Sequence, residues 1–310
     1  MRILTIAIGL GIFGAFAVGA AAGEGDRIDA AHAKNAVFAW VVRQGFTADG
    51  ATLKLPEPRL RDGQPAEAQR AALREVAGSD RKLDEMLRDS VTAPYIIRVR
   101  DVKARDATIH VVSVWFVVHA DLAGIDPAHE AAKTSGQSAE AGNMAFHTRI
   151  LGPEDLRQAG LAPPADKDAS GPETWYAHIH GRLLDRIAFD ATSQAQATRT
   201  DESIVVAART DPAFDRAEAG AVANGWRPVT AGKGAADAAG GERKPYAGGV
   251  SYARISRLAF QPGALLVEMH AAFVEPQEWF QGAPILRSKF SVIAQDQIRR
   301  LRRELKQRRK

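Results

Sequence analysis

The chain has 310 residues, a formal net charge of +4 at neutral pH and no cysteine. Without cysteine it can form neither a disulfide nor a thiolate metal site, and it lacks the modifiable cysteine of a lipoprotein. Its stability must therefore come from a packed core, for which this length is ample.

The first 23 residues have the three parts of a secretory signal peptide. Arg2 supplies a positive start, residues 3–18 are apolar, and Ala20-Ala21-Ala22 offers small residues to signal peptidase. We therefore expect cleavage near residue 22 and an exported protein, periplasmic or extracellular, of a bacterial envelope. The alternative is an uncleaved anchor in the inner membrane, because residues 3–22 are just long enough to span a bilayer. We expect no transmembrane span in the mature chain.

Helical patterns come first after the leader. Apolar residues recur at helical spacing over residues 28–44, and Gly45 is placed to end that helix. A short extended stretch at residues 51–55 leads into prolines, and two further helices are expected at residues 66–77 and 80–89. The mature chain is therefore expected to begin with a group of helices.

From residue 95 the apolar pattern changes to a period of two. Residues 95–102 alternate, and residues 108–120 are apolar on both faces, which predicts a central strand covered on both sides. A strand at 144–150 and a short helix at 153–159 follow. Together with the helices they make a first subdomain, residues 24–161.

Residues 162–173, rich in Gly, Ala and Pro, are expected to link this part to a β-rich subdomain, residues 174–293. The strands predicted there are residues 175–190, 203–209, 250–260, 265–274 and 286–293, with a Pro-Gly turn between the third and fourth. We expect an α+β fold with antiparallel β-hairpins forming the main sheet or sheets. A hairpin, a strand and a helix occur in this order in both halves, with Phe146 and Phe290 in matching strands, which suggests a duplication.

The last twelve residues carry a strong positive charge. Eight are cationic and one, Glu304, is acidic, so residues 1–298 have a formal charge of −3, which is +4 minus +7. Every third or fourth residue from Ala294 to Leu305 is apolar, which predicts a basic amphipathic helix over residues 294–310. The cations are Arg299, Arg300, Arg302, Arg303, Lys306, Arg308, Arg309 and Lys310.

Such a helix suits two roles. It can dock on the body through its apolar stripe and leave solvated arginines outside, or it can bind an anionic partner, either an envelope surface or an acidic protein. Nucleic acid is not expected as a partner, because the body is acidic and the protein is exported.

A second candidate lies in the predicted strand at residues 175–190. Alternate side chains of a strand share one face, which would assemble a polar ridge suited to a carboxylate, sulfate or phosphate group. A solvated sheet face is the alternative. The ridge residues are Tyr176, His178, His180, Arg182 and Arg186.

His178 and His180 also have the spacing of two metal ligands on one strand. Two imidazoles are too few, however, and Arg182 on the same face would oppose a cation. The residues available as a third ligand are not indicated by spacing; they are His110, His119, His147, His270 and Asp185. We therefore expect no metal and no cofactor.

Trp226 and Trp279 lie in predicted loops, where they are candidate ligand platforms or, alternatively, plugs over the core. Motifs for a serine nucleophile elbow, a zinc helix or a phosphate loop are absent from the sequence. The sequence thus favours a non-catalytic binding or interaction module with a basic tail for an anionic partner. The alternative is a metal-independent hydrolase of an envelope polymer, because two catalytic acids need no proximity in sequence.

Overall fold

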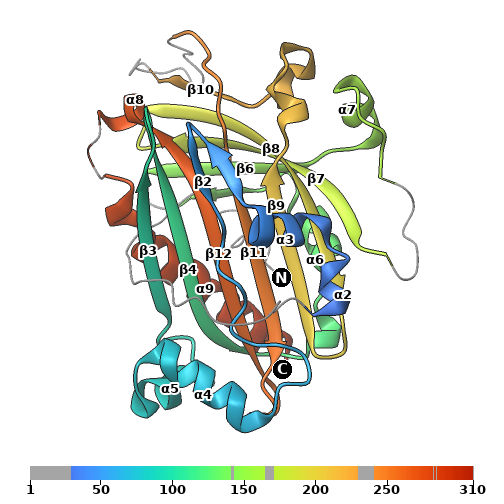
Figure 1. Ribbon diagram of the computed structural model, residues 1–310, viewed down its shortest axis with the longest axis vertical. Helices are drawn as coiled ribbons and strands as arrows, with labels where there is room; N and C mark the ends of the chain where they lie inside the picture. The colour runs from blue at the N-terminus through green and yellow to red at the C-terminus, as the bar shows by residue number, and fades with distance from the viewer. Residues whose placement is uncertain are drawn as a thin grey trace.

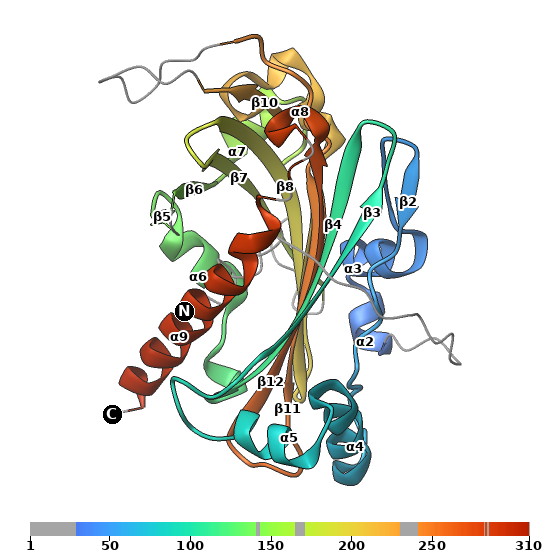
Figure 2. The ribbon, with the colours of Figure 1, turned by 90° about the vertical axis from the view of Figure 1, so that its left-hand side faces the viewer.

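The computed structural model describes residues 29–140, 143–164, 171–229, 241–281, 283 and 285–309. Within them, one large antiparallel sheet forms the centre of the molecule, and helices lie on both of its faces (Figures 1 and 2). The α+β class predicted from the sequence is confirmed. The predicted leader, residues 1–23, lies outside the described residues.

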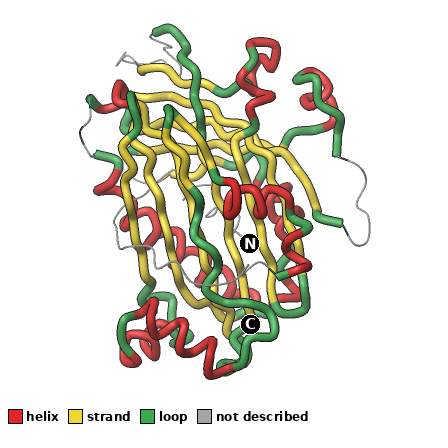
Figure 3. The backbone as a smooth tube through the Cα atoms, in the orientation of Figure 1, coloured by secondary structure: helices red, strands yellow, loops and turns green. Residues whose placement is uncertain are grey.

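Figure 3 shows the strands of the sheet running side by side. Ten strands lie within the described ranges, and every neighbouring pair is antiparallel. Nine form one path in the order β3-β4-β12-β11-β9-β8-β7-β6-β5, and β10 pairs with the first residues of β8. The strands are β3 (Ile96–Lys103), β4 (Ala107–His119), β5 (Ser138–Glu140), β6 (Met144–Ile150), β7 (Glu173–Leu183), β8 (Ile187–Arg199), β9 (Ser203–Thr210), β10 (Gly225–Pro228), β11 (Gly249–Arg257) and β12 (Ala264–Pro276).

Two groups of elements cover the sheet. Residues 29–64, which we call the N-terminal segment, cover one face, here the N-terminal face; α9 and α6 cover the other, here the α9 face (Figure 2). The N-terminal segment contains α2 (Ala30–Ala33), α3 (Ala36–Ala39), a π-helical turn (Trp40–Gln44), β1 (Phe46–Ala48) and β2 (Ala51–Leu53). The remaining helices are α4 (Ala66–Ala77), α5 (Asp80–Met86), α6 (Pro127–Thr134), α7 (Pro153–Gln158), α8 (Gln277–Phe280) and α9 (Phe290–Arg308).

Strands β4 and β12 form the middle of the core. They pair along their full lengths, from Ala107 opposite Pro276 to His119 opposite Ala264. Nearly every residue of both strands is buried, so apolar side chains pack on both faces, as predicted for residues 108–120. Because β4 precedes the predicted linker and β12 follows it, the two expected subdomains contribute strands to one sheet.

The predicted single strand at residues 175–190 is wrong, because these residues form the β7-β8 hairpin. Leu184 and Asp185 make its tight turn, with φ values of 51° and 54°. Turns with this backbone usually contain Gly or Asn, so the sequence lacked the usual signal for a reversal. Arg186 consequently lies at the end of a turn and is not in the strand that carries Tyr176.

The predicted strand at residues 286–293 is also wrong. Residues 287–289 form a 3-10 turn, and α9 begins at Phe290. The buried residues Phe290, Ile293 and Ala294 are spaced by three and one, and they extend the stripe that continues to Leu305. The duplication hypothesis required Phe290 in a strand, so it is wrong as well.

The predicted helix at residues 28–44 is interrupted within the described part. Asn35 stands between α2 and α3, where its side chain accepts a hydrogen bond from the backbone N–H of Phe38 at 2.9 Å. Its amide nitrogen also donates to the backbone oxygen of Gln196 in β8 at 2.9 Å. The break therefore serves both to cap α3 and to attach it to the sheet. Gly45, with a φ of 93°, ends the helical stretch as predicted.

Candidate functional site

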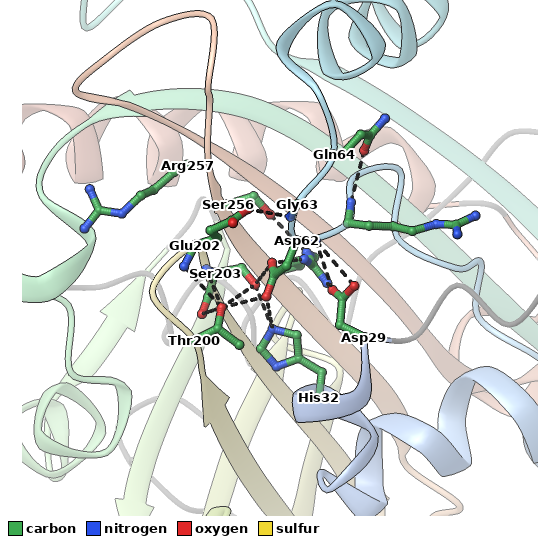
Figure 4. Close-up of polar contacts among 12 residues, drawn as sticks. Asp29, His32, Asp62, Gly63, Gln64, Thr200, Glu202, Ser203, Ser256 and Arg257 are labelled. Carbon is green, nitrogen blue, oxygen red and sulfur yellow. Dashed lines mark hydrogen bonds and ion pairs between the residues drawn. The ribbon is translucent and has the colours of Figure 1, made fainter.

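A buried polar cluster lies where the N-terminal segment meets β9 and β11 (Figure 4). Arg254 of β11 is 1 % exposed, and its two Nη atoms each lie 2.6 Å from a carboxylate oxygen, one of Asp29 and one of Asp62. Its Nε donates to Ser256 Oγ at 3.0 Å. One guanidinium thus joins the beginning of the N-terminal segment, the loop after β2 and the middle of the sheet.

His32 of α2 is fully buried beside this arginine. Its Nδ1 lies 2.9 Å from Thr198 Oγ1 and its Nε2 lies 2.7 Å from Ser203 Oγ, which donates to Asp62 at 2.6 Å. Burial, aided by the positive charge of Arg254, lowers the pKa of His32 to about 4, although the two carboxylates oppose this. The imidazole is therefore neutral at neutral pH.

This cluster has the residue types of a metal site and of a nucleophilic site, but the geometry of neither. Ligand atoms of Asp29, His32 and Asp62 lie within 4.8 Å of one another, yet the Arg254 guanidinium already bridges the carboxylates and would repel a cation. The acid contacts the Ser203 hydroxyl rather than the imidazole Nδ1, and this serine is fully buried, so no acid–histidine–serine relay forms. The cluster attaches the N-terminal segment to the sheet.

Four of the five predicted ridge residues share the N-terminal face of β7. Tyr176 and His178 are nonetheless buried, the first against Phe214 and the second with its Nδ1 2.9 Å from Thr192 Oγ1. Arg182 forms an ion pair with a turn residue, Asp185, at 3.1 Å. Of the ridge residues on β7, only His180 and Arg182 are partly accessible, and the exposed Arg186 lies in the turn and is not part of the ridge.

Asp190 of β8 organises the histidine pair. Its Oδ1 lies 2.8 Å from His180 Nδ1 and 3.5 Å from His178 Nε2, and its Oδ2 lies 3.1 Å from Arg243. Burial raises the pKa of Asp190, but hydrogen bonds to the two histidines and the charges of His180 and Arg243 hold it well below its usual range. The result is an ion-paired centre, with a guanidinium where a metal site needs an open position.

The acid beside the histidines was missed at the sequence level for a specific reason. A single strand through residue 190 places Asp190 far along the chain from His178, whereas the hairpin turn brings it directly opposite His180. The signal that could have found it is the polar turn at Asp185-Arg186, read as a reversal. Of the five residues considered as third ligands, His147 of β6 lies directly opposite His180, with its Nδ1 3.5 Å from Ser138 Oγ.

Trp226 and Trp279 belong to a buried aromatic cluster on the α9 face. They lie in β10 and α8 rather than in loops, and their exposed fractions are 4 % and 3 %. Their ring centroids are 6.0 Å apart, and those of Tyr246 and Phe189 lie 5.3 Å and 6.0 Å from Trp279. Both tryptophans thus fill the core and offer no surface for a ligand.

Helix α9 docks on the sheet through one buried stripe. Arg302 lies within this stripe and is 6 % exposed; it donates to the backbone oxygens of Val117 at 3.0 Å, of Pro94 at 3.3 Å and of Ala93. Burial lowers its pKa to about 10, so it stays charged. The apolar part of the stripe is Phe290, Ile293, Ala294, Ile298, Leu301 and Leu305. One of the eight tail cations therefore anchors the helix.

Three more tail cations form ion pairs. Arg309 holds both carboxylate oxygens of Asp89 at 3.0 Å, and Arg308 contacts Glu130 of α6 at 3.3 Å. Arg300 pairs with the glutamate four residues later at 3.4 Å. The Arg309 hydrogen bonds hold the pKa of Asp89 below its ordinary value. The contacts of Arg309 and Arg308 connect α9 to the loop after α5 and to α6, whereas the Arg300 pair lies within α9.

The outward side of α9 carries three cations that no described carboxylate pairs with: Arg299, Arg303 and Lys306. They follow one another by four and three residues, so they project from the same side of the helix, beside the buried stripe. Arg303 and Lys306 are exposed and Arg299 is half-buried. The helical rise makes this outward row about 10 Å long. Lys310, the last of the eight, lies outside the described residues.

No protein-family model matches the chain, and no curated protein matches it. Among the described residues, no helix is both long and apolar enough to cross a membrane. Function must therefore be inferred from the geometry of this molecule alone.

Proposed function

We propose that this protein is an exported, non-catalytic binding module of the bacterial envelope that attaches to an anionic envelope surface through the outward side of α9. The observation that supports this proposal is the outward row of Arg299, Arg303 and Lys306, none of which forms an ion pair with a described carboxylate, although the charge of Lys306 helps to hold the pKa of Asp89 low. Near an anionic surface each such cation contributes about 1 kcal/mol of attraction.

The charge of the rest of the chain supports a defined orientation. Residues 1–298 have a formal charge of −3, so an anionic surface repels the body and attracts only the helix. Because α9 is held by its apolar stripe and by Arg302, the row is presented in a fixed geometry. Fixing the cations in advance lowers the entropy that binding must remove.

Export rests on the predicted leader, which an independent measurement can test. Sequencing the N-terminus of the protein recovered from cells should find a first residue near Gly23, as the small residues Ala20-Ala21-Ala22 predict. A chain that still begins with Met1 would support the inner-membrane anchor instead.

The surface proposal is tested by removing outward charges without disturbing the docked side. The double variant Arg303→Gln, Lys306→Gln changes only exposed residues, whereas deleting residues 299–310 would also remove the buried Leu301 and Leu305. The matched control is Lys54→Gln, Arg105→Gln, which removes two exposed cations near the β1-β2 hairpin. Thermal melting of both variants should match that of the parent.

Binding is measured by co-sedimentation with vesicles containing about 30 % phosphatidylglycerol at about 50 mM and about 500 mM salt. The parent and the control should bind at low salt and dissociate at high salt. The outward-row variant should bind roughly 30-fold more weakly, as expected for two cations of about 1 kcal/mol each. Equal affinity of all three proteins would reject α9 as the binding surface, and no binding by the parent would reject the function.

One observation favours the second candidate, a metal-independent hydrolase. Asp190 contacts Nδ1 of His180 at 2.8 Å, which is the orientation in which a carboxylate prepares an imidazole to act as a general base. If this pair is catalytic, purified cell-wall glycan should be cleaved by the parent and not by His180→Gln. Cleavage that survives the substitution would remove His180 from consideration.

A further inference from the structure

We infer that the anionic partner is a phospholipid surface, and that one of its phosphate groups is held in a cationic notch between α9 and the loop after α5. This inference rests on the proposed function and names the chemistry of its ligand. The residues of the notch that bear on the inference are Arg88 and Asp89 of the loop, His119 at the end of β4, and Arg302, Lys306 and Arg309 of α9.

Positive charge dominates the notch. Its four arginine and lysine side chains contribute +4 and Asp89 contributes −1, which leaves +3 without counting His119. The lowered pKa of Asp89 agrees with this excess of positive charge. Its hydrogen bond to Arg309, and then the charges of Arg309, His119 and Lys306, lower this pKa, although partial burial opposes the change. An arriving anion therefore meets a converging positive potential.

Two of these cations have most of their donors free of protein partners. Arg302 donates from all three of its nitrogens to backbone oxygens, and Arg309 donates from both Nη atoms to Asp89. Arg88 has a hydrogen bond only from its Nε, to the backbone oxygen of Glu85 at 3.3 Å, and Lys306 has none with any described residue. Because Arg88 and Lys306 both line the notch, the terminal nitrogens of Arg88 and the Lys306 ammonium are available there as donors.

The unfilled donors suit a phosphate better than a carboxylate. A carboxylate, Asp89, is already present and is matched by Arg309 alone. The remaining excess charge is more fully neutralised by a phosphomonoester, such as the headgroup of phosphatidic acid, which carries about −1.5 to −2, than by a second carboxylate or by a phosphodiester, which carries a single negative charge. A guanidinium and an ammonium on either side of an oxyanion are a recurrent phosphate-binding pair.

The size of the notch limits how the phosphate sits. The enclosed space is about 10 Å³, which accepts roughly one water-sized group. One phosphate oxygen can therefore enter, while the rest of the group stays at the mouth between the exposed side chains of Arg88 and Lys306. This position leaves a lipid free to continue away from the protein.

A lipid surface is favoured over a soluble phosphate because Lys306 belongs to two features at once. It lines the notch and it also ends the outward row that begins at Arg299. A single soluble phosphate would use only the notch, whereas a surface that carries many phosphates would contact the notch and the row together.

The experiment compares two vesicle types of equal measured surface potential, one containing phosphatidic acid and the other a carboxylate-headed lipid, cholesteryl hemisuccinate. The parent protein should bind the phosphate vesicles about fivefold or more tightly. Arg88→Gln changes only the notch and should abolish this preference. Arg303→Gln, matched in charge but outside the notch, should weaken binding to both vesicle types about equally and keep the preference.

Each failure has its own meaning. Binding to both vesicle types without preference would overturn the phosphate inference and leave the proposed function standing, and a preference that survives Arg88→Gln would overturn the notch. Binding to neither vesicle would overturn the proposed function itself. Inorganic phosphate at about 10 mM and constant ionic strength should compete only weakly; complete release of the protein would identify a soluble anion as the ligand and overturn the lipid assignment.

Discussion

The two faces of the sheet are covered by segments that bind it through different forces. On the N-terminal face the cover completes buried hydrogen bonds: the backbone N–H of Arg59 donates to Glu268 at 2.8 Å, and the hydroxyl of Tyr252 donates to the backbone oxygen of Pro56 at 2.6 Å. On the other face α9 packs mainly through its apolar stripe. Among the buried residues of this stripe, Arg302 makes the polar side-chain contacts with the sheet and its neighbouring loop.

This difference explains why a ligand is expected on one side of the molecule and not on the other. Hydrogen bonds and ion pairs are directional, so the N-terminal segment is held in one position, and two of its carboxylates, those of Asp29 and Asp62, are paired with the buried Arg254. Apolar packing uses only the inner half of a helix, which leaves the outer half of α9 free to carry charge. The four predictions below test this contrast.

The largest effect is expected from Arg254→Met, which removes the cation from the bridge between Asp29 and Asp62. Both carboxylates are largely buried, at 15 % and 21 % side-chain exposure, and would lose their partner. We expect the free energy of unfolding to fall by about 3–5 kcal/mol. Urea denaturation measures it.

A triple variant sharpens this result. Adding Asp29→Asn and Asp62→Asn to Arg254→Met removes the unpaired charges and should restore much of the lost stability. On the α9 face, Met269→Leu keeps side-chain volume and should cost less than about 1.5 kcal/mol. If Arg254→Met costs no more than Met269→Leu, the N-terminal face does not depend on its ion pairs.

The pH dependence of stability should have opposite signs for two histidines on the two faces. On the N-terminal face, burial lowers the pKa of His32 from 6.5 to about 4. Between these values the unfolded chain binds a proton that the folded chain does not, so the stabilisation is present above pH 6.5 and falls by up to about 3 kcal/mol as the pH decreases to 4. Urea denaturation should show that the difference in free energy of unfolding between the parent and His32→Gln becomes smaller as the pH falls toward 4.

On the α9 face, His110 lies between two carboxylates. Burial lowers its pKa, but hydrogen bonds at 2.8 Å to Asp101 and to Glu275 outweigh burial and raise it above 6.5. Its contribution is therefore complete below pH 6.5 and is lost as the pH rises through the folded value. The difference in free energy of unfolding between the parent and His110→Gln, measured by urea denaturation, should become smaller as the pH increases. If the stability difference from the parent changed with pH in the same direction for both variants, the predicted contrast between the two faces would be wrong.

A smaller loss is expected where the sheet has no room for a side chain. A Cβ on Gly181 of β7 would lie 2.0 Å from the ring of Phe189, which packs against Trp279. Gly181→Ala should lower the melting temperature by an amount equivalent to about 1–3 kcal/mol, with no dependence on pH between 5 and 8. Gly124→Ala is the control, because a Cβ there meets nothing within 4 Å.

The smallest effect is expected from Arg309→Gln. The pair that Arg309 forms with Asp89 is exposed, at 40 % and 47 % of the two side chains, and such pairs contribute about 1 kcal/mol or less. Thermal melting should therefore change little. A loss of several kcal/mol would mean that this pair, and not the apolar stripe, holds the end of α9.

The sequence was most informative where a local pattern dictates structure. Gln261-Pro262-Gly263-Ala264 was predicted as a type II turn, and Ala264 N–H donates to the backbone oxygen of Gln261 at 3.1 Å with a φ of 77° at Gly263. The helix at residues 66–77 matches α4 in both bounds, because Pro65 and Gly78 mark its ends. In each case residues adjacent in the chain determine the geometry.

The sequence misled where a local pattern was ambiguous. The apolar run before residue 294 fits a strand or a helix equally over eight residues, and only its packing on the sheet resolves it as the first turn of α9. The reversal at Leu184-Asp185 lacks glycine, the usual mark of such a turn, and the polar residues there are only a weak signal for the hairpin that sets Asp190 beside His180. The Arg254 cluster joins three segments whose meeting has no local signature.

By itself, the sequence determined the class of the fold, the buried central strand and the amphipathic nature of the last helix, since all three follow from the spacing of apolar residues along the chain. Only the tertiary structure decided which cations of that helix remain available. Arg302 is consumed by backbone oxygens of the sheet, and Arg308 and Arg309 by acids 178 and 220 residues away. Pairing across such separations depends on how the elements pack. No local stretch of sequence could therefore predict that Arg299, Arg303 and Lys306 remain without an ion-pair partner among the described residues.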